Sequence, residues 1–175
     1  MNNCFNVISK KSLVTICILG VFPLVAQAAT TTTTFAVTAT VAAACTVTAT
    51  PLAFGTFVPA NATNLDQTNT ISVTCTNGTT YAVGLNAGTS SGATVTTRKM
   101  TGTTSTSNLL PYELYSNTGR TTNWGNTPGT DTPAASTGTG AVQTLTVYGR
   151  IPTNTTAVPD SYSDTITVTV TFPYP

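Results

Sequence analysis

Apolar and polar side chains alternate along most of the chain after residue 30, as they do in β-strands that are buried on one face only. Between residues 31 and 49 the odd positions are largely apolar and the even positions carry mostly hydroxyl groups. The same period of two predicts further strands at 52–57, 70–76, 80–86, 109–116, 141–149 and 162–172. Stretches rich in Gly, Asn, Pro and Ser separate them, and no segment has a helical repeat long enough to predict a helix. The pattern therefore predicts an all-β domain.

Asn77-Gly78 is a strong local signal for a two-residue hairpin between the strands that flank it. A hairpin of that kind would pair Val73 with Ala82, and directly paired residues share a face. The large apolar side chains of the second strand fall one position away, and a slip of one residue turns every side chain to the other face. Either the loop is longer, or the two strands lie in opposite sheets. We expect the second arrangement, in which an immunoglobulin-like sandwich sends its strand B across to the facing sheet as strand C.

The last predicted strand has the most regular alternation. Its apolar face consists of Ile166, Val168, Val170 and Phe172, and threonines fill the other face. The sequence then stops at residue 175, so we expect no closing strand beside it, whereas a complete immunoglobulin sandwich has a strand G after strand F. The fold class predicted is an incomplete immunoglobulin-like sandwich that lacks its C-terminal G strand and has an open apolar acceptor groove along these four residues.

The first predicted strand is too long for one domain. Its 19 residues would span roughly 60 Å, about three times the usual length. We expect the domain's own first strand to begin at Cys45, inside a domain of residues 42–175, and residues 29–41 to be a donor segment. The aligned apolar side chains of the donor segment are Phe35, Val37, Ala39 and Val41.

Insertion of the donor segment into the groove of another copy would be a case of β-strand addition. Repeated head to tail without closing a ring, such a contact gives a filament. The alternative is that residues 29–41 form a disordered, threonine-rich leader, as chain termini often do. Four apolar side chains on one face weigh against this alternative, because an exposed apolar strand promotes aggregation.

Residues 1–28 have the features of a secretory signal peptide. Lys10 and Lys11 precede an apolar stretch at 13–25, and Ala26-Gln27-Ala28 fits the cleavage pattern. The apolar stretch is shorter than the ~18 residues expected of a membrane span. We therefore expect cleavage after Ala28, with a retained signal anchor as the alternative.

Cleavage would leave Cys45 and Cys75 as the only cysteines. Two cysteines in an exported chain favour one disulfide. It would close a loop of about 31 residues and stabilise the fold by roughly 3.5 kcal/mol. The spacing is not that of a Cys-x-x-Cys redox motif, so we expect the disulfide to be structural.

The composition limits which catalytic and metal-binding chemistries the side chains can perform. The 175 residues suit a single domain. Threonine makes up 43 of the 147 residues from position 29 onward, which suits strands with one wet face. The chain has no histidine and a single glutamate, Glu113, so most hydrolytic and metal chemistries lack their usual side chains. We expect no catalytic residue, no metal and no cofactor. A formal charge of +1 also argues against nucleic acid as a partner.

Two other classes of function stay open at this stage. A carbohydrate-binding module would need exposed aromatic side chains, and Tyr112, Tyr115, Trp124 and Tyr148 are available, although Tyr112 and Tyr115 fall on opposite faces of one strand. Trp124, in the loop-like stretch 117–140, is either a packing anchor or an exposed binding residue.

A glycosidase needs two carboxyl groups across a cleft. Its candidates are Asp160, Asp164 and Glu113. Simpler roles are a turn residue for Asp160 and a solubilising strand-edge charge for Asp164. The cations Arg98, Lys99 and Arg150 are likewise expected to be solvated or at strand edges. We therefore expect that the protein is not an enzyme.

The order and spacing of several segments resemble a known family. These segments are FAVTATVAAACTVTATPLAFGTF, ISVTCTNGTTYAVGL, RKMTG, LLPYELY, WG, VYGRIP and DSYSDTITVTVTF. Together they are similar to the spore coat protein U domain, a family that includes subunits of archaic, Csu-type chaperone–usher pili. The resemblance extends from about residue 35 to residue 172. It implies a pilin that lacks its last strand, with a disulfide between its first two strands that matches Cys45 and Cys75.

The resemblance also implies partners and a location. A periplasmic chaperone would cover the groove until the donor segment of the next copy, or of a related pilin, replaces it at an outer-membrane usher. The product would be a surface fibre used for adhesion and biofilm formation. A single domain favours a shaft or adaptor subunit over a two-domain tip subunit. The family also contains spore coat proteins, so a coat protein of the same fold is the alternative.

Overall fold

The computed structural model describes residues 26–153 and 155–173. The chain divides into two compact units, Met1–Ala39 and Thr40–Pro175. In the first unit the described residues, 26–39, are exposed and form neither helix nor strand. The predicted signal peptide lies outside the described residues except for positions 26–28. In the described part of the chain, no helix has both the length and the apolar character needed to cross a membrane.

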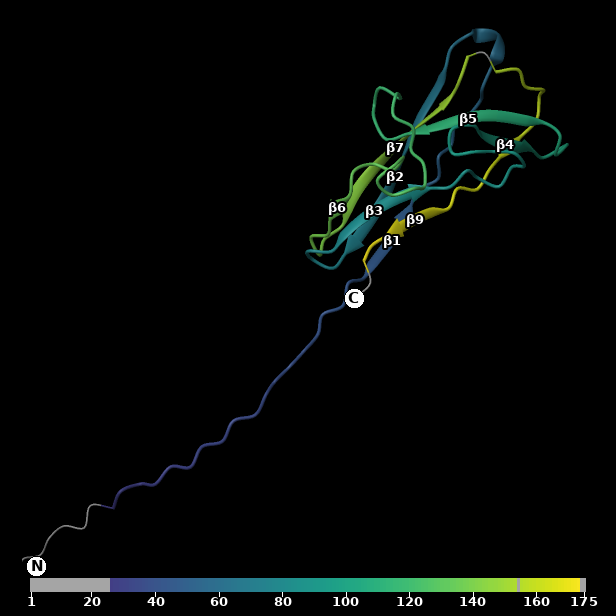
Figure 1. Ribbon diagram of the computed structural model, residues 1–175. Helices are drawn as coiled ribbons and strands as arrows, with labels where there is room; N and C mark the ends of the chain where they lie inside the picture. The colour runs from purple at the N-terminus through teal and green to yellow at the C-terminus, as the bar shows by residue number, and fades with distance from the viewer. Residues whose placement is uncertain (1–25, 154, 174–175) are drawn as a thin grey trace, which may run out of the picture. The chain divides into compact units, whose positions relative to one another are not determined.

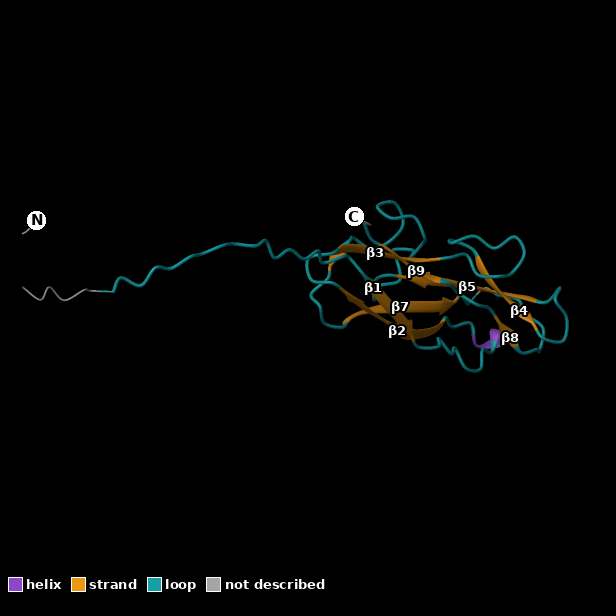
Figure 2. Cartoon of the chain, turned by 90° about the horizontal axis from the view of Figure 1, so that it is seen from below, coloured by secondary structure: helices purple, strands orange, loops and turns teal. Residues whose placement is uncertain are grey.

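The second unit, called the β-domain below, is a sandwich of two antiparallel sheets (Figure 1 and Figure 2). Its strands are β1 (Cys45–Ala49), β2 (Leu65–Cys75), β3 (Thr80–Leu85), β4 (Arg98–Gly102), β5 (Leu109–Tyr115), β6 (Ser136–Thr137), β7 (Gln143–Ile151), β8 (Tyr162–Ser163) and β9 (Val168–Thr171). A short 3-10 helix, Pro59–Asn61, precedes β2. The larger sheet has the order β1-β2-β7-β5-β4-β8 and the smaller one β6-β3-β9. The predicted all-β, immunoglobulin-like class is confirmed.

The core lies between the two sheets and is built by the predicted alternation. In β5, for example, Leu110, Tyr112 and Leu114 are buried and the residues between them are not. Trp124 also belongs to the core: it is 1% exposed, and its Nε1–H donates to the carbonyl of Val83 at 2.8 Å. Of the two expectations for this residue, the packing anchor is confirmed.

The predicted crossing between sheets is confirmed at Asn77-Gly78. β2 belongs to the larger sheet and β3 to the smaller one. Gly78 has a φ of +83°, in the left-handed region that glycine tolerates. Its N–H donates to the carbonyl of Gly138 at 2.9 Å, and the N–H of Thr79 donates to that of Thr76 at 3.0 Å. The connection is therefore a tight turn that changes sheets.

The strand predicted at 52–57 is wrong, because this segment joins no sheet. Pro51 has no N–H to donate to a ladder, and Gly55 has a φ of +76°. Leu52 and Phe54 nevertheless pack inward, since a Cβ at Gly149 of β7 would lie 2.6 Å from Leu52 Cδ2 and 2.9 Å from Phe54 Cζ. Residues 51–57, called the strap below, therefore lie across the inner face of the larger sheet.

The single last strand predicted at 162–172 is divided between the sheets. β8 pairs with β4 and β9 pairs with β3. Between them, Asp164 Oδ1 accepts hydrogen bonds from the N–H groups of Thr89 and Thr165 at 2.7 and 2.8 Å. These side-chain contacts replace the ladder, so Asp164 is a partly buried structural residue and not a solubilising edge charge. The alternation itself is retained: residues 166, 168, 170 and 172 are half-buried, and 165, 167, 169 and 171 are exposed.

Two of the cations expected to be solvated or at strand edges are instead built into the fold. Arg98 begins β4, a strand that the sequence pattern missed, and it is 0% exposed. Arg150 lies on β7, inside the larger sheet, and forms a two-point ion pair with Asp66 through Nε–Oδ1 and Nη2–Oδ2 contacts of 2.8 Å each. The prediction was wrong because the pattern does not show which strands lie between others.

Candidate apolar binding groove

One edge of each sheet borders the same opening in the β-domain. Among the described residues, β1 pairs only with β2 and β9 pairs only with β3, so each has one unpaired side. The two strands approach each other, as Figures 1 and 2 both show. An unpaired strand edge is a template for another strand.

The core is closed over β2 and open at β1. Val47 of β1 pairs with Val73 of β2, and Ala49 pairs with Ile71. Val73 and Ile71 are 0% and 1% exposed, whereas Val47 is 36% exposed and Ala49 is exposed. Since paired residues share a face, the inward side of β1 lacks a cover that β2 has.

The four residues predicted to line an acceptor groove lie on the opposite side of the opening. They share the inward face of the last segment and pack, partly buried, against the core: Ile166, Val168, Val170 and Phe172. The structure therefore places them together on one face.

A cavity of about 400 Å³ lies between these two borders. Core side chains form part of its lining, namely Ile71, Leu85, Leu114 and Val147. A second cavity, of about 640 Å³, continues beyond the strap and includes Phe57, Leu110, Ile151 and Ala157 in its lining. Leu52, Phe54, Met100 and Tyr162 line both cavities. The two cavities together form one long groove that is lined mostly by apolar residues. The strap contributes to both halves of this groove, a role that the sequence pattern did not reveal.

Several polar residues also line the first cavity, namely Thr50, Asn69, Tyr112, Ser163, Asp164 and Thr165. Asn69 donates from Nδ2 to the carbonyl of Thr50 at 2.6 Å, and its buried Oδ1 has no hydrogen-bond partner among the described residues. Tyr112 donates from its hydroxyl to Asp164 Oδ2 at 2.6 Å. Burial, together with that hydrogen bond, raises the pKa of Tyr112 well above its ordinary value, so the phenol stays protonated. The groove thus presents mostly apolar residues together with a minority of polar ones.

The carboxylates considered for catalysis are held apart. Asp164 binds Tyr112 on the inner face of β5, whereas Glu113 accepts a hydrogen bond from Tyr115 on the outer face. Asp160 accepts from Thr104 N at 3.1 Å and from other donors of the 103–108 turn. Desolvation alone would raise the pKa of Asp160, but these hydrogen bonds outweigh it and hold the pKa below its ordinary range. All three are structural acceptors.

In the part of the chain that the structure describes, no group of three or more His, Cys, Asp or Glu side chains could hold a metal ion.

The four aromatic residues considered for a sugar platform do not lie on one surface. Tyr112 and Trp124 are buried, and only Tyr115 and Tyr148 pair, across β5 and β7 on the outer face. The Arg120 guanidinium lies 5.7 Å from the Tyr148 ring centroid. Arg120 also forms an ion pair with Asp66 at 3.3 Å, so the Tyr148 ring lies beside a cluster of charged side chains. The side-chain period of the sequence does not reveal this cluster.

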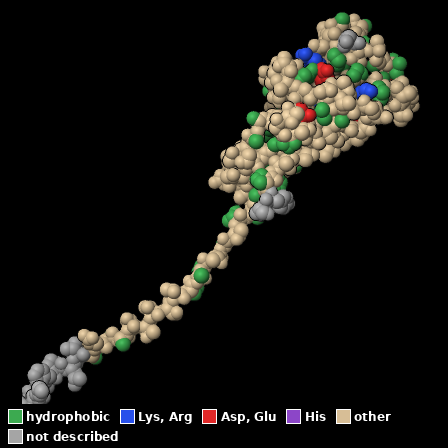
Figure 3. All heavy atoms as spheres, in the orientation of Figure 1, with side chains coloured by type: hydrophobic (Ala, Val, Ile, Leu, Met, Phe, Trp, Pro, Cys, Tyr) green, Lys and Arg blue, Asp and Glu red, His purple; other side chains and the backbone are tan. Residues whose placement is uncertain are grey.

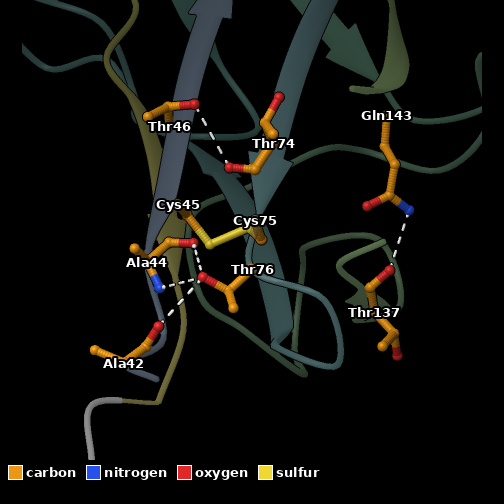
Figure 4. Close-up of a disulfide and its surroundings, with 9 residues drawn as sticks. All are labelled: Ala42, Ala44, Cys45, Thr46, Thr74, Cys75, Thr76, Thr137 and Gln143. Atoms are coloured by element: carbon orange, nitrogen blue, oxygen red, sulfur yellow. Dashed lines mark hydrogen bonds between the residues drawn. A yellow bond between two sulfur atoms is a disulfide. The ribbon is translucent and has the colours of Figure 1, made fainter. Parts of the chain in front are cut away.

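The disulfide between Cys45 and Cys75 is present and joins β1 to β2 (Figure 4). The predicted pairing is confirmed.

On the predicted donor segment, Phe35, Val37 and Val41 are 86%, 83% and 83% exposed, and Ala39 is exposed. In the face of the molecule shown in Figure 3, charged side chains are few.

The β-domain thus has the form of an immunoglobulin-like antiparallel sandwich in which two unpaired strand edges border an apolar groove. Residues 31–169 match the Spore Coat Protein U domain family. The chain is also 36% identical over 160 residues to Protein U of Myxococcus xanthus, across 84% of this chain and 88% of that protein. The protein belongs to the spore coat protein U domain family.

A solved structure has the same fold. It is a chain in the crystal structure of the CsuC–CsuE chaperone–tip adhesion subunit pre-assembly complex from archaic chaperone–usher Csu pili of Acinetobacter baumannii. The TM-score is 0.54 and the sequence identity 22%, over 73% of this chain. This chain spans only 39% of the length of that one. At this identity the likeness concerns the fold alone.

Proposed function

We propose that this protein is a structural, pilin-type subunit that polymerises into a surface fibre, with the donor segment of one copy occupying the groove of the next. One observation supports this most strongly. Ala49 of β1, which is exposed, and Val168 of β9, which is only half-buried, line a groove between two unpaired strand edges. A complete sandwich would cover them with its own strand, and the exposed apolar row at Phe35, Val37 and Val41 has the chemistry to do so.

The energetics suit an inserted strand. A large apolar side chain contributes ~1.5–3 kcal/mol when it is fully buried, so three of them contribute about 5–9 kcal/mol before costs. Association opposes this by an estimated ~4–15 kcal/mol. Main-chain hydrogen bonds to β1 and β9, and burial of Val47 and Val168 from the acceptor, add to the favourable side. The balance is modest at equilibrium, but dissociation requires the whole strand to leave, which gives a fibre kinetic stability.

Partners and location follow from the same groove. An open apolar groove is an aggregation hazard before assembly, so a periplasmic chaperone is the expected temporary occupant and an outer-membrane usher the expected site of exchange. The structural neighbour, which comes from a chaperone–subunit complex, supports a chaperone partner. Residues 1–28 supply the export signal. The fibre at the cell surface then serves adhesion and biofilm formation.

Two variants test the proposal. A chain without residues 29–41 should still bind the chaperone but should not polymerise. Val168→Asp places a charge on the groove side of β9 and should reduce both chaperone capture and assembly. The matched control is Thr169→Asp, one residue away on the exposed face of the same strand. Fibres from the deletion variant in electron micrographs, or equal assembly of the two Asp variants, would contradict the proposal.

A coat protein of the same fold is the second candidate. The family description and the 36% identity to Protein U favour it. Both functions use the same polymerisation, so they differ in where the polymer is found. Immunogold labelling of producing cells should show thin fibres that extend from the surface in the first case and a continuous layer in the second.

A further inference from the structure

Each copy carries both a donor segment and a groove, so closure of the chain on itself competes with joining a second copy. This question rests on the proposed function. Closure would make residues 29–41 turn back and run antiparallel to β1. Val41 and Cys45 both belong to apolar faces, so they would have to pair, and residues 42–44 would become a three-residue loop.

The sequence of that loop is poorly suited to a reversal. All three residues, at positions 42–44, are alanine. Three-residue hairpin loops usually need one residue in the left-handed region, which glycine adopts readily and alanine does not. In the structure none of the three has a positive φ.

Thr76 hydrogen-bonds to two of these three residues, Ala42 and Ala44, and keeps the segment in line with β1 (Figure 4). The N–H of Thr76 donates to the carbonyl of Ala44 at 2.9 Å, which extends the pairing of β1 with β2 by one residue. The N–H of Ala44 in turn donates to Thr76 Oγ1 at 3.2 Å.

The Thr76 hydroxyl also reaches the carbonyls of Ala42 and Ala44, at 3.3 and 3.4 Å, and its one proton can serve either. Thr76 itself is fixed by the adjoining turn and by the disulfide at the neighbouring residue. A reversal at 42–44 would break the hydrogen bonds of the Thr76 hydroxyl to Ala42 and Ala44.

We propose that Thr76 is a positioning residue that disfavours closure of the chain on itself and so directs the donor segment to a second copy. Its hydroxyl does this through its hydrogen bonds to Ala42 and Ala44. The main-chain hydrogen bond from residue 76 to Ala44 would form with any side chain at this position except proline. The side chain therefore has an effect that substitution can separate from the fold.

The test compares Thr76→Val, which keeps the shape and removes the hydroxyl, with two controls. Thr76→Ser keeps the hydroxyl. Thr74→Val makes the same change two residues earlier on β2, where the hydroxyl makes no hydrogen bond among the described residues. The oxidised chain from Ala29 onward is refolded at a series of concentrations. Light scattering then gives the polymer fraction, and proteolysis of residues 29–41 shows whether the monomer is closed.

Thr76→Val should raise the ratio of protease-resistant monomer to polymer by roughly two- to tenfold, the equivalent of one neutral hydrogen bond. The two controls should match the unmodified chain. Equal ratios for Thr76→Val and Thr74→Val, with polymers in both, would overturn the role of Thr76 and leave the proposed function standing. Absence of polymer in every chain, with residues 29–41 always cleaved, would overturn the proposed function and this inference with it.

Hydrogen exchange on the unmodified chain gives a check that does not depend on folding of the variants. The amide of Ala44 donates to Thr76 Oγ1, so it should exchange at least severalfold more slowly than an unstructured alanine amide. Exchange at the unstructured rate would overturn the proposal.

Discussion

Arg98 is the residue whose replacement should damage the β-domain most. Its guanidinium donates to four main-chain carbonyls: from Nε to Asn86 at 2.9 Å, from Nη1 to Val95 at 2.6 Å, and from Nη2 to Leu85 at 2.9 Å and Trp124 at 2.7 Å. These carbonyls belong to the end of β3, the turn before β4 and the loop that carries Trp124. One side chain thus ties together segments of both sheets.

The magnitude follows from the number of contacts and from burial. A hydrogen bond to a charged group contributes about 1.5–3 kcal/mol, but desolvation of the cation offsets much of that sum. Burial lowers the pKa of Arg98 from its ordinary value, although arginine stays protonated in proteins. Loss of the guanidinium leaves four carbonyls without this donor, at about 1–3 kcal/mol for each one that stays unsatisfied, and relief of the desolvation of the cation offsets part of this, so the net loss should be about 3–5 kcal/mol. We expect a loss of that size for Arg98→Met and a similar loss for Arg98→Lys, because an ammonium cannot reach four carbonyls.

Urea unfolding of the chain without residues 29–41 would measure this loss without a contribution from assembly. Lys99→Met, at the next position, is the matched control, because Lys99 is only half-buried and substitutions outside a core usually change stability by less than about 0.5 kcal/mol. A loss below about 1 kcal/mol for Arg98→Met, or equal losses at the two positions, would show that the four hydrogen bonds of Arg98 do not stabilise the β-domain to this extent.

Three further predictions concern the stability of the β-domain. Replacing both Cys45 and Cys75 by Ser should lower the free energy of unfolding by roughly 3.5 kcal/mol; an unchanged urea midpoint would contradict this. Gly149→Ala should cost about 1–3 kcal/mol, because its Cβ would lie 2.6 Å from Leu52 Cδ2, and an unchanged midpoint would show that the strap yields freely. The hydrogen bond from Arg150, with the added charge of Arg120, holds the pKa of Asp66 below its ordinary value of 3.8. Its contribution is therefore present above about pH 4 and lost on further acidification, so Asp66→Asn should flatten the acid side of a stability–pH curve, and an unaltered curve would count against it.

The features that sequence predicted well depend on the side-chain period. The crossing at Asn77-Gly78 followed from a one-residue mismatch between two apolar faces, and the fold class followed from alternation along most of the chain. The half-buried face of the last segment, which includes Val168, was predicted from the same alternation. These features are local or involve neighbouring strands, and the period reports them directly.

The features that sequence missed depend on contacts between distant segments. The strap alternates like a strand, yet its ladder is absent because Pro51 and the left-handed Gly55 prevent it. Residues 65–69 are too polar to predict as strand, but Asp66 pairs with Arg150 across the sheet. Arg98 looked like a solvated charge because nothing in its neighbourhood along the chain shows the four carbonyls that surround it. Register and burial of this kind require the folded chain.

If the groove accepts residues 29–41 of another copy, a separate peptide of that sequence should bind there as well. The peptide is added to the chain without residues 29–41, and thermal unfolding and amide exchange are followed. We expect saturable binding, with slower exchange at the unpaired edges of β1 and β9. We also expect a stabilisation of about 2.7 kcal/mol when the peptide is present at 100 times its Kd. A peptide with Val37→Asp should have little effect. No stabilisation by the unmodified peptide, or protection confined to strands other than β1 and β9, would show that the groove does not accept this segment.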